Sequence, residues 1–164
     1  MKKILISAVV VLALVGVGLW QFGGSAKAAP NVSFTALDGR TFTTSDLRGK
    51  VVMVKFWATS CVTCIQQMPD TAQAYEQYKQ QGYEVIAVAM DYDPPAYVRN
   101  FAETRQLPFT VAIDSTGEVA KAFGDVKLTP TAFLIDKQGH IIKRYLGNYD
   151  KDAFKRTVEQ ALAG

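Results

Sequence analysis

The chain has 164 residues, of which 49% are hydrophobic and 20% charged, so it is long enough to bury a sizeable core and too apolar to be disordered. Its net charge of +3 comes from the N-terminus, because residues 1–30 hold three of the 18 basic residues and no acid, which leaves 15 of each sign in residues 31–164. That balance gives no support for nucleic-acid binding, and two cysteines with one histidine exclude a disulfide-rich scaffold, a four-cysteine zinc site and any site that needs two histidines.

The first residues have the pattern of an export signal. Lys2 and Lys3 precede an apolar run of 17 residues, 4–20, and Ala28 closes a small-x-small sequence typical of a cleavage site. Because the run is longer than in an ordinary signal peptide and close to the lower limit for crossing a bilayer, retention as a membrane anchor is favoured over cleavage near Ala28. The two lysines hold the N-terminus in the cytoplasm, so the remaining chain is predicted to be exported.

After a signal or anchor segment of residues 1–30, residues 31–164 are predicted to form one domain. Asp38-Gly39 predicts the turn of a hairpin over 34–42. The apolar, β-branched run 51–57 predicts a buried central strand. The other elements expected before residue 124 are a helical turn at 45–48, helices at 61–81, 93–106 and 118–123, and strands at 83–90 and 109–113.

Two of these helices contain residues that are expected to kink or end them. Pro69 is expected to kink the first helix, and Gly82 to close it. Asp93 is expected to cap the second helix, with Pro94 at its first position.

The last part of the chain predicts an antiparallel hairpin and a final helix. Strands at 131–136 and 141–146 are separated by a connection that admits only a tight turn, and Asp150 is expected to cap a helix over 151–162. Strands that alternate with helices, followed by this hairpin, predict an α/β domain with a mixed central sheet flanked by helices.

The sequence Cys61-Val62-Thr63-Cys64 falls between the buried strand and the first helix. Free N–H groups and the positive end of the helix dipole stabilise a thiolate there, which lowers the pKa of Cys61 below the roughly 8.5 of a free cysteine. Cys64 lies one turn inside the helix and is expected to be more buried. A structural disulfide would close too short a loop to add much stability, and a metal site would need further ligands, so the pattern indicates redox chemistry.

Thr129-Pro130 stands immediately before a predicted strand, the one place in a central strand where proline is tolerated. A cis peptide bond is one interpretation, and an ordinary trans proline is favoured by the frequencies of X–Pro bonds alone.

Together these motifs resemble the thioredoxin superfamily, and in particular the TlpA-like and ResA-like thiol–disulfide oxidoreductases of bacterial envelopes. The resemblance covers about residues 32–162, and the leader, the N-terminal hairpin and an added β-α segment at 83–106 narrow it to those proteins. The residues that carry it are 56–64, Pro69, Thr129, Pro130 and 133–139.

The resemblance implies a thioredoxin-like fold with Cys61 as nucleophile and Cys64 as resolving cysteine. It also implies that Pro130 is cis and faces the pair, and that Thr129 offers backbone groups to an extended substrate. By the same resemblance, a monomeric protein on the periplasmic side of the inner membrane reduces disulfides in exported proteins, apocytochromes c among them. A membrane electron donor of the DsbD or CcdA type keeps it reduced, with no metal and no cofactor beyond the Cys61–Cys64 disulfide.

Three positions depart from that family pattern. Ser60 replaces a frequent tryptophan, Thr63 replaces a frequent proline, and Gln67 stands where ResA-like proteins carry a glutamate that would raise the thiol pKa by repulsion. These changes leave the reduction potential and the direction of electron flow unpredicted, and they weaken the case for apocytochromes as substrates.

Lys55 and Trp57 are further candidates for tuning the pair, with Gln67. Lys55 interrupts the buried strand where thioredoxins keep an acid. The favoured interpretation is that its stem packs and its ammonium reaches solvent; the alternative is that it lies beneath the cysteines and favours a thiolate. Trp57 either packs near the pair or serves only the core.

Two other functions remain open on the same residues. A Sco-like copper chaperone would use soft thiolates for Cu(I), but such proteins have CxxxC and a histidine, and His140 falls in a predicted hairpin turn. A peroxiredoxin-like peroxidase would need a threonine three residues before its cysteine, whereas Thr59 is two before Cys61.

Overall fold

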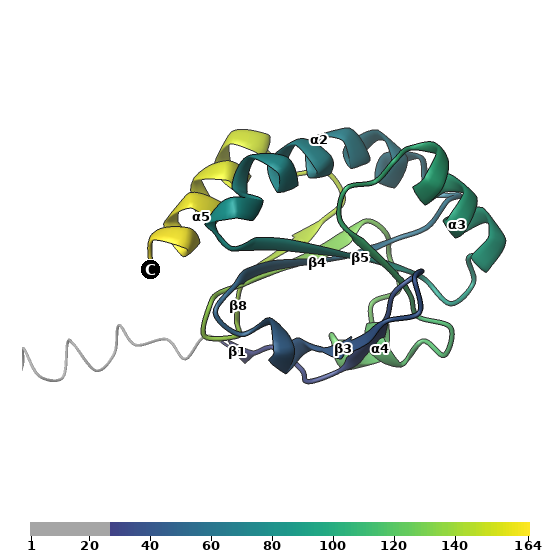
Figure 1. Ribbon diagram of the computed structural model, residues 1–164, viewed down its shortest axis with the longest axis horizontal. Coiled ribbons are helices and arrows are strands. Elements are labelled where there is room, and N and C mark those ends of the chain that lie inside the picture. Colours follow the sequence, from purple (N-terminus) through teal and green to yellow (C-terminus); the bar gives the residue numbers. More distant parts are fainter. Residues whose placement is uncertain (1–26) are drawn as a thin grey trace, which may run out of the picture.

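The computed structural model describes residues 27–164, so the apolar run 4–20 lies outside the described residues. Within the described part, none of the helices combines the length and the apolar character needed to cross a membrane. A six-stranded sheet with the order β1-β8-β7-β4-β5-β6 forms the centre, and a two-stranded sheet of β2 and β3 lies beside it (Figure 1).

The N-terminal half contains β1 (Lys27–Ala28), β2 (Ser33–Thr35), β3 (Thr41–Thr43), the 3₁₀ turn η1 (Thr44–Leu47), β4 (Val51–Trp57), α2 (Val62–Tyr78), the 3₁₀ turn η2 (Lys79–Gln81) and β5 (Tyr83–Ala89). The C-terminal half contains α3 (Pro95–Thr104), β6 (Thr110–Ile113), α4 (Glu118–Ala122), β7 (Thr131–Ile135), β8 (His140–Leu146) and α5 (Lys151–Ala163).

The direction of the strands confirms the predicted mixed sheet. β4, β5 and β6 are parallel, as expected for strands joined through helices. β7 runs antiparallel to β4, and β8 runs antiparallel to β7 across the predicted hairpin. The hairpin β2–β3 is tied to the sheet by a bridge between Ala36 and Ala112.

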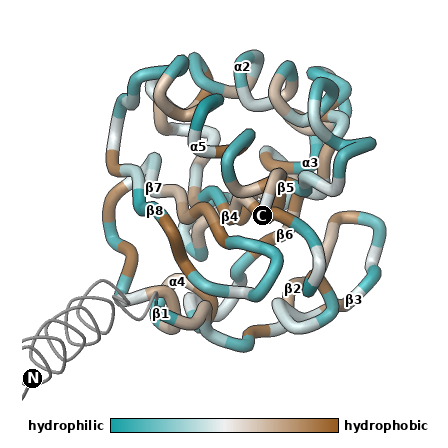
Figure 2. Tube along the Cα trace, turned by 90° about the vertical axis from the view of Figure 1, so that its left-hand side faces the viewer, coloured by the Kyte–Doolittle hydropathy of each residue, from teal (hydrophilic) through white to brown (hydrophobic). Residues whose placement is uncertain are grey.

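Side chains of β4 alternate between the two faces of the sheet and build both halves of the core. Met53 and Trp57 belong to one buried cluster with α2 and α5, whereas Val54 and Phe56 belong to the other, with the hairpin and α4. Figure 1 shows α2, α3 and α5 covering one face and β3 with α4 on the other, and Figure 2 shows apolar stretches of the central strands beneath the more polar helix α2. Each such buried side chain contributes roughly 1.5–3 kcal/mol.

Two boundaries differ from expectation. Lys27 and Ala28, upstream of the predicted domain start at residue 31, pair with Ile141 and His140 at the edge of β8. The α3 helix takes Pro94 as its N-cap, without a side-chain hydrogen bond. The predicted cap of that helix, Asp93, has a different partner.

Candidate active site

The two cysteines lie where β4 gives way to α2. Cys61 is the N-cap residue of α2, and its Sγ accepts a hydrogen bond from the Cys64 N–H at 3.2 Å. The two residues form a disulfide with their Cα atoms 5.2 Å apart. Cys61 is partly exposed and Cys64 fully buried, which confirms the predicted order of exposure. Only Cys61 can meet a protein substrate, and its sulfur lies at the helix N-terminus that stabilises a thiolate.

The Thr129–Pro130 peptide bond is cis, as the family resemblance implies. Thr131 begins β7 and pairs with Phe56 near the end of β4. The Thr131 hydroxyl also donates to the Leu128 carbonyl at 2.6 Å and so fixes the turn before the strand. Because β4 and β7 are direct neighbours, the cis-proline loop and the cysteine loop emerge at the same end of the sheet.

Exposed apolar side chains surround this end of the molecule. Val62 is 69% exposed beside Cys61, and Leu128 is 65% exposed beside Thr129. Tyr92 is 56% exposed, and its hydroxyl lies 3.5 Å from the Thr129 Oγ1. Apolar groups exposed around a reactive cysteine suit an extended polypeptide segment rather than a small polar molecule.

Lys55 is fully buried, so the expectation that its ammonium reaches solvent is wrong. Its Nζ donates to Gln67 Oε1 at 2.8 Å and to Thr71 Oγ1 at 3.2 Å, and it lies 5.9 Å from the ring centroid of Tyr149. Burial lowers the pKa of Lys55 to about 7, an effect that the carboxylate of Asp70 partly opposes. The strand position decides this outcome, because residue 55 points into the α2 side of the sheet halfway along a covered strand.

Gln67 connects the buried lysine to the helix that carries the cysteines. It follows Cys64 by three residues, so the two side chains lie on one face of α2, and both are buried. Its Nε2 donates to the Gly147 carbonyl at 3.0 Å and to Asn148 Oδ1 at 3.1 Å. The amide orientation that serves these acceptors turns Oε1 toward Lys55. Gln67 therefore joins β4, α2 and the loop after β8.

Sequence reasoning missed the other members of this network, Thr71, Asn148 and Tyr149, of which Thr71 is buried. Thr71 follows Gln67 by four residues on a predicted helix, a spacing that signals a shared face. Nothing in the spacing of residues 148 and 149 indicates that the loop after β8 returns to α2.

Trp57 is fully buried and packs against Phe101, with ring centroids 5.3 Å apart. It belongs to the same buried cluster as Cys64 and Met68. The tryptophan is therefore part of the core that also contains Cys64.

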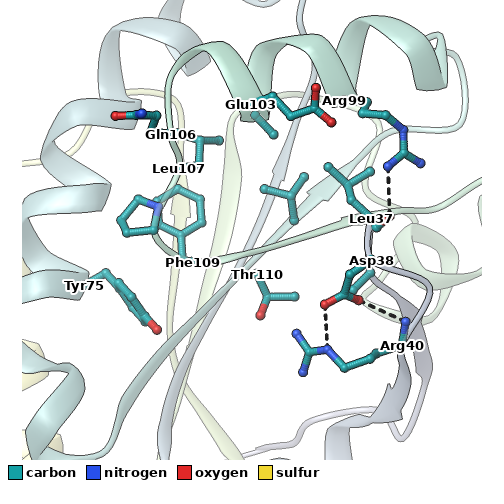
Figure 3. Close-up of a pocket in the computed structure, with 14 residues that line it drawn as sticks. Leu37, Asp38, Arg40, Tyr75, Arg99, Glu103, Gln106, Leu107, Phe109 and Thr110 are labelled. Atoms are coloured by element: carbon teal, nitrogen blue, oxygen red, sulfur yellow. Dashed lines mark hydrogen bonds and ion pairs between the residues drawn. The ribbon is translucent and has the colours of Figure 1, made fainter.

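A cleft of about 650 Å³ lies elsewhere, between the β2–β3 turn, α3 and β6 (Figure 3). Neither cysteine lines it. Its two arginines are engaged with near neighbours: Arg99 donates to the Leu37 carbonyl at 2.9 Å, and Arg40 pairs with Asp38 at 2.7 Å. The cleft is therefore not part of the redox site.

His140 stands at the opposite end of β8 from the cysteines. It pairs with Ala28, whereas Leu146 at the far end of the strand pairs with Thr131 beside the cis-proline. Seven residues of strand span roughly 20 Å. Among residues 27–164 there is no group of three or more His, Cys, Asp or Glu side chains that could hold a metal ion. The copper-chaperone alternative therefore lacks its histidine ligand near the pair.

Comparisons with known proteins agree with this site. The model of the Redoxin family matches residues 24–162. The thiol–disulfide oxidoreductase ResA of Bacillus thuringiensis subsp. konkukian is 39% identical over 134 residues, which cover 82% of this chain and 76% of that protein. ResA of Geobacillus thermodenitrificans is 38% identical over 133 residues, covering 81% and 75%.

Solved structures show the same fold. A thiol:disulfide interchange protein of the thioredoxin family from Chlorobium tepidum has a TM-score of 0.77 at 29% identity, over 85% of this chain and 98% of that one. The pneumococcal exposed lipoprotein thioredoxin from Streptococcus pneumoniae has a TM-score of 0.69 at 29% identity, over 79% and 98%. The fold is therefore thioredoxin-like, as predicted.

Proposed function

Because the chain belongs to the Redoxin family and is a ResA-like thiol–disulfide oxidoreductase, we propose that it reduces disulfides in exported proteins by cycling Cys61 and Cys64 between dithiol and disulfide. The observation that carries the proposal is the unequal exposure of the two sulfurs at the start of α2. One sulfur meets the substrate and the other is fully buried behind it.

The cycle follows from that geometry. The Cys61 thiolate attacks one sulfur of the substrate disulfide, and the other substrate sulfur leaves as a thiolate that takes up a proton. Cys64 then loses its proton and attacks Cys61 Sγ; the mixed disulfide breaks, and the second substrate sulfur leaves. Two electrons pass to the substrate while the Cys61–Cys64 disulfide forms. A membrane donor of the DsbD or CcdA type returns two electrons, and no further cofactor takes part.

The substrate lies against the cis-proline loop in this proposal. Thr129 offers backbone groups to an extended segment, and Pro130 leaves that edge free of a competing strand. The exposed side chains of Val62 and Leu128 favour segments with apolar residues near the disulfide. Lys55, Gln67 and Trp57 form the layer under the pair and tune its redox balance.

We place the domain on the periplasmic side of the bacterial inner membrane. The support is the sequence of residues 1–30, with two lysines ahead of an apolar run, and the likeness to an exposed lipoprotein thioredoxin of Streptococcus pneumoniae. Retention of the run 4–20 as an anchor predicts that the protein sediments with membranes and keeps residues 1–28, which a measurement of its intact mass tests. A mature N-terminus at Ala29 would exclude the anchor and leave export intact.

The direction of electron flow is tested by the reduction potential of the Cys61–Cys64 couple, measured in glutathione or dithiothreitol buffers. A reductase fed by a membrane donor is expected to lie near the value of thioredoxin, about −270 mV, or lower. A value near −120 mV, typical of DsbA, would identify an oxidant and overturn the proposed direction.

A further inference from the structure

Asp93 is a buried carboxylate that accepts two hydrogen bonds, both from a single residue of the cysteine loop. It is 3% exposed. Its Oδ2 accepts from the Thr59 N–H at 2.6 Å, and its Oδ1 accepts from the Thr59 hydroxyl at 2.5 Å. Thr59 lies in the loop of residues 58–60 that leads from β4 into Cys61. The two residues are 34 positions apart in the chain, so this contact exists only in the folded protein.

Backbone hydrogen bonds hold the two ends of the same loop. The Met90 N–H donates to the Trp57 carbonyl at 3.0 Å, and the Asp93 N–H donates to the Met90 carbonyl at 3.0 Å. The Cys61 N–H donates to the Ala58 carbonyl at 3.1 Å. The loop is therefore held by backbone bonds at both ends and by the carboxylate in its middle.

The carboxylate has no comparable role in its own helix. α3 starts with Pro94 as N-cap and has no side-chain cap bond, although aspartate before proline is a common helix start. Burying a carboxylate is costly unless its oxygens accept hydrogen bonds. Here both oxygens are turned to Thr59, so the free energy of those bonds is available to hold the loop.

We propose that Asp93 is a positioning residue for the redox reaction, which acts through Thr59 to fix the 58–60 loop and so to hold Cys61 Sγ at the N-terminus of α2. The proposal rests on the assignment of Cys61 as the attacking cysteine. The bond from the Cys64 N–H to Cys61 Sγ requires the extended N-cap backbone of Cys61, with φ −89° and ψ 99°. A loop released at Thr59 loses this arrangement, and the thiolate loses donors that stabilise it.

Two substitutions of Asp93 separate positioning from charge. In Asp93→Asn the amide oxygen can accept from the Thr59 N–H while the amide nitrogen donates to Thr59 Oγ1, so both bonds survive without the charge. In Asp93→Ala both bonds are lost. Thr59→Val removes only the hydroxyl bond, and Thr59→Ser keeps it.

The measurement is the rate of Cys61 alkylation by iodoacetamide in the fully reduced protein at pH 7, with the labelled cysteine identified by mass. We expect Asp93→Ala to react about five- to tenfold more slowly than wild type, the factor that corresponds to a lost N-cap hydrogen bond. Asp93→Asn and Thr59→Ser should stay within about twofold, and Thr59→Val should fall between. The melting temperature of each variant is measured in parallel.

Two results overturn the proposal. Equal alkylation rates in wild type, Asp93→Ala and Thr59→Val, with only the melting temperature lowered, would assign the contact to stability alone. Asp93→Asn as impaired as Asp93→Ala would assign the effect to charge. Should Asp93→Ala not fold, Thr59→Val decides, because an unchanged rate there contradicts positioning. Alkylation needs no protein substrate, so a failure of the proposed reductase activity leaves this test standing.

Discussion

Replacing Cys61 with serine is expected to reduce disulfide reduction to the uncatalysed background, and replacing Cys64 with serine is expected to trap a mixed disulfide with the substrate. Cys61 is the partly exposed sulfur and Cys64 the fully buried one. A serine at position 61 cannot attack a disulfide at neutral pH. A serine at position 64 leaves the attack intact and removes the step that releases the product.

The rate loss for Cys61→Ser should be at least about a thousand-fold, since removing a covalent nucleophile can cost on the order of 10⁶ in kcat. The assay follows insulin reduction with dithiothreitol as electron source. For Cys64→Ser, a non-reducing gel and intact mass should show the enzyme and a substrate chain joined in equal amounts. The adduct should disappear when excess dithiothreitol is added.

Ser60→Ala is the matched control, because Ser60 is exposed and adjacent to the nucleophile. It should turn over at a rate close to wild type. A mixed disulfide that accumulates in Cys61→Ser instead of Cys64→Ser would reverse the two roles. Turnover that survives in both single variants would remove the dithiol cycle altogether.

The strands were predictable because the local pattern of apolar and β-branched residues determines where they form. The run 51–57 is apolar and β-branched throughout, and the structure gives β4 the same bounds. The helix after it begins one residue later than expected, with Cys61 as N-cap. Gly82, with φ +92°, ends the following 3₁₀ turn in the left-handed conformation that glycine adopts freely.

The partners of polar side chains were not predictable from the same patterns. The local pattern at Asp93 predicts a helix cap, yet its carboxylate accepts its hydrogen bonds from a threonine 34 residues away. Lys55 reads locally as a residue that extends toward water, yet Gln67 and Thr71 lie over it on α2. Both errors have one cause: the choice between a local and a distant partner depends on how helices lie on the sheet, which neither periodicity nor spacing encodes.

The pairing of Lys27 and Ala28 with β8 was missed for a related reason. Two residues carry no strand pattern of their own, and the export signal dominates the composition around them. They join the sheet because the edge of β8 leaves backbone groups free. Sequence reasoning therefore located the chemistry of the site but not the buried polar contacts that support it.

Lys55→Met is expected to change the pH dependence of stability more than any other single substitution discussed. The pKa of Lys55 falls from 10.5 to about 7 on folding, because the ammonium loses its water. Between those values the unfolded chain binds a proton that the folded chain does not, so wild-type stability rises with pH across that window. Below about pH 7 the whole penalty, at most about 5 kcal/mol, is present.

Methionine removes this titration while keeping most of the buried volume. It also leaves Gln67 Oε1 without its donor, which costs about 1–3 kcal/mol at any pH. The gain from Lys55→Met should therefore be greatest at pH 6 and shrink or reverse by pH 10. Burial raises the pKa of Tyr149, whose ring centroid lies 5.9 Å from the Lys55 Nζ, to about 12, which is above this window.

Urea unfolding of the oxidised protein at several pH values between 6 and 10 measures the effect, with Lys50→Met as control. Lys50 precedes the same strand but is half-exposed, in a 3.3 Å pair with Glu84, so its loss should change stability by less than about 1 kcal/mol with no new pH dependence. If the free energy of unfolding changes with pH in the same way in wild type and in Lys55→Met, the buried ammonium keeps its ordinary pKa.

The same variant tests whether Lys55 tunes the cysteines. An ammonium beneath the pair favours a thiolate, and a stabilised thiolate favours the reduced form. Lys55→Met should then raise the pH midpoint of Cys61 alkylation and lower the reduction potential of the couple, while Lys50→Met changes neither. If stability responds but the alkylation midpoint does not, Lys55 anchors α2 to β4 through Gln67 and Thr71 and has no part in the redox balance.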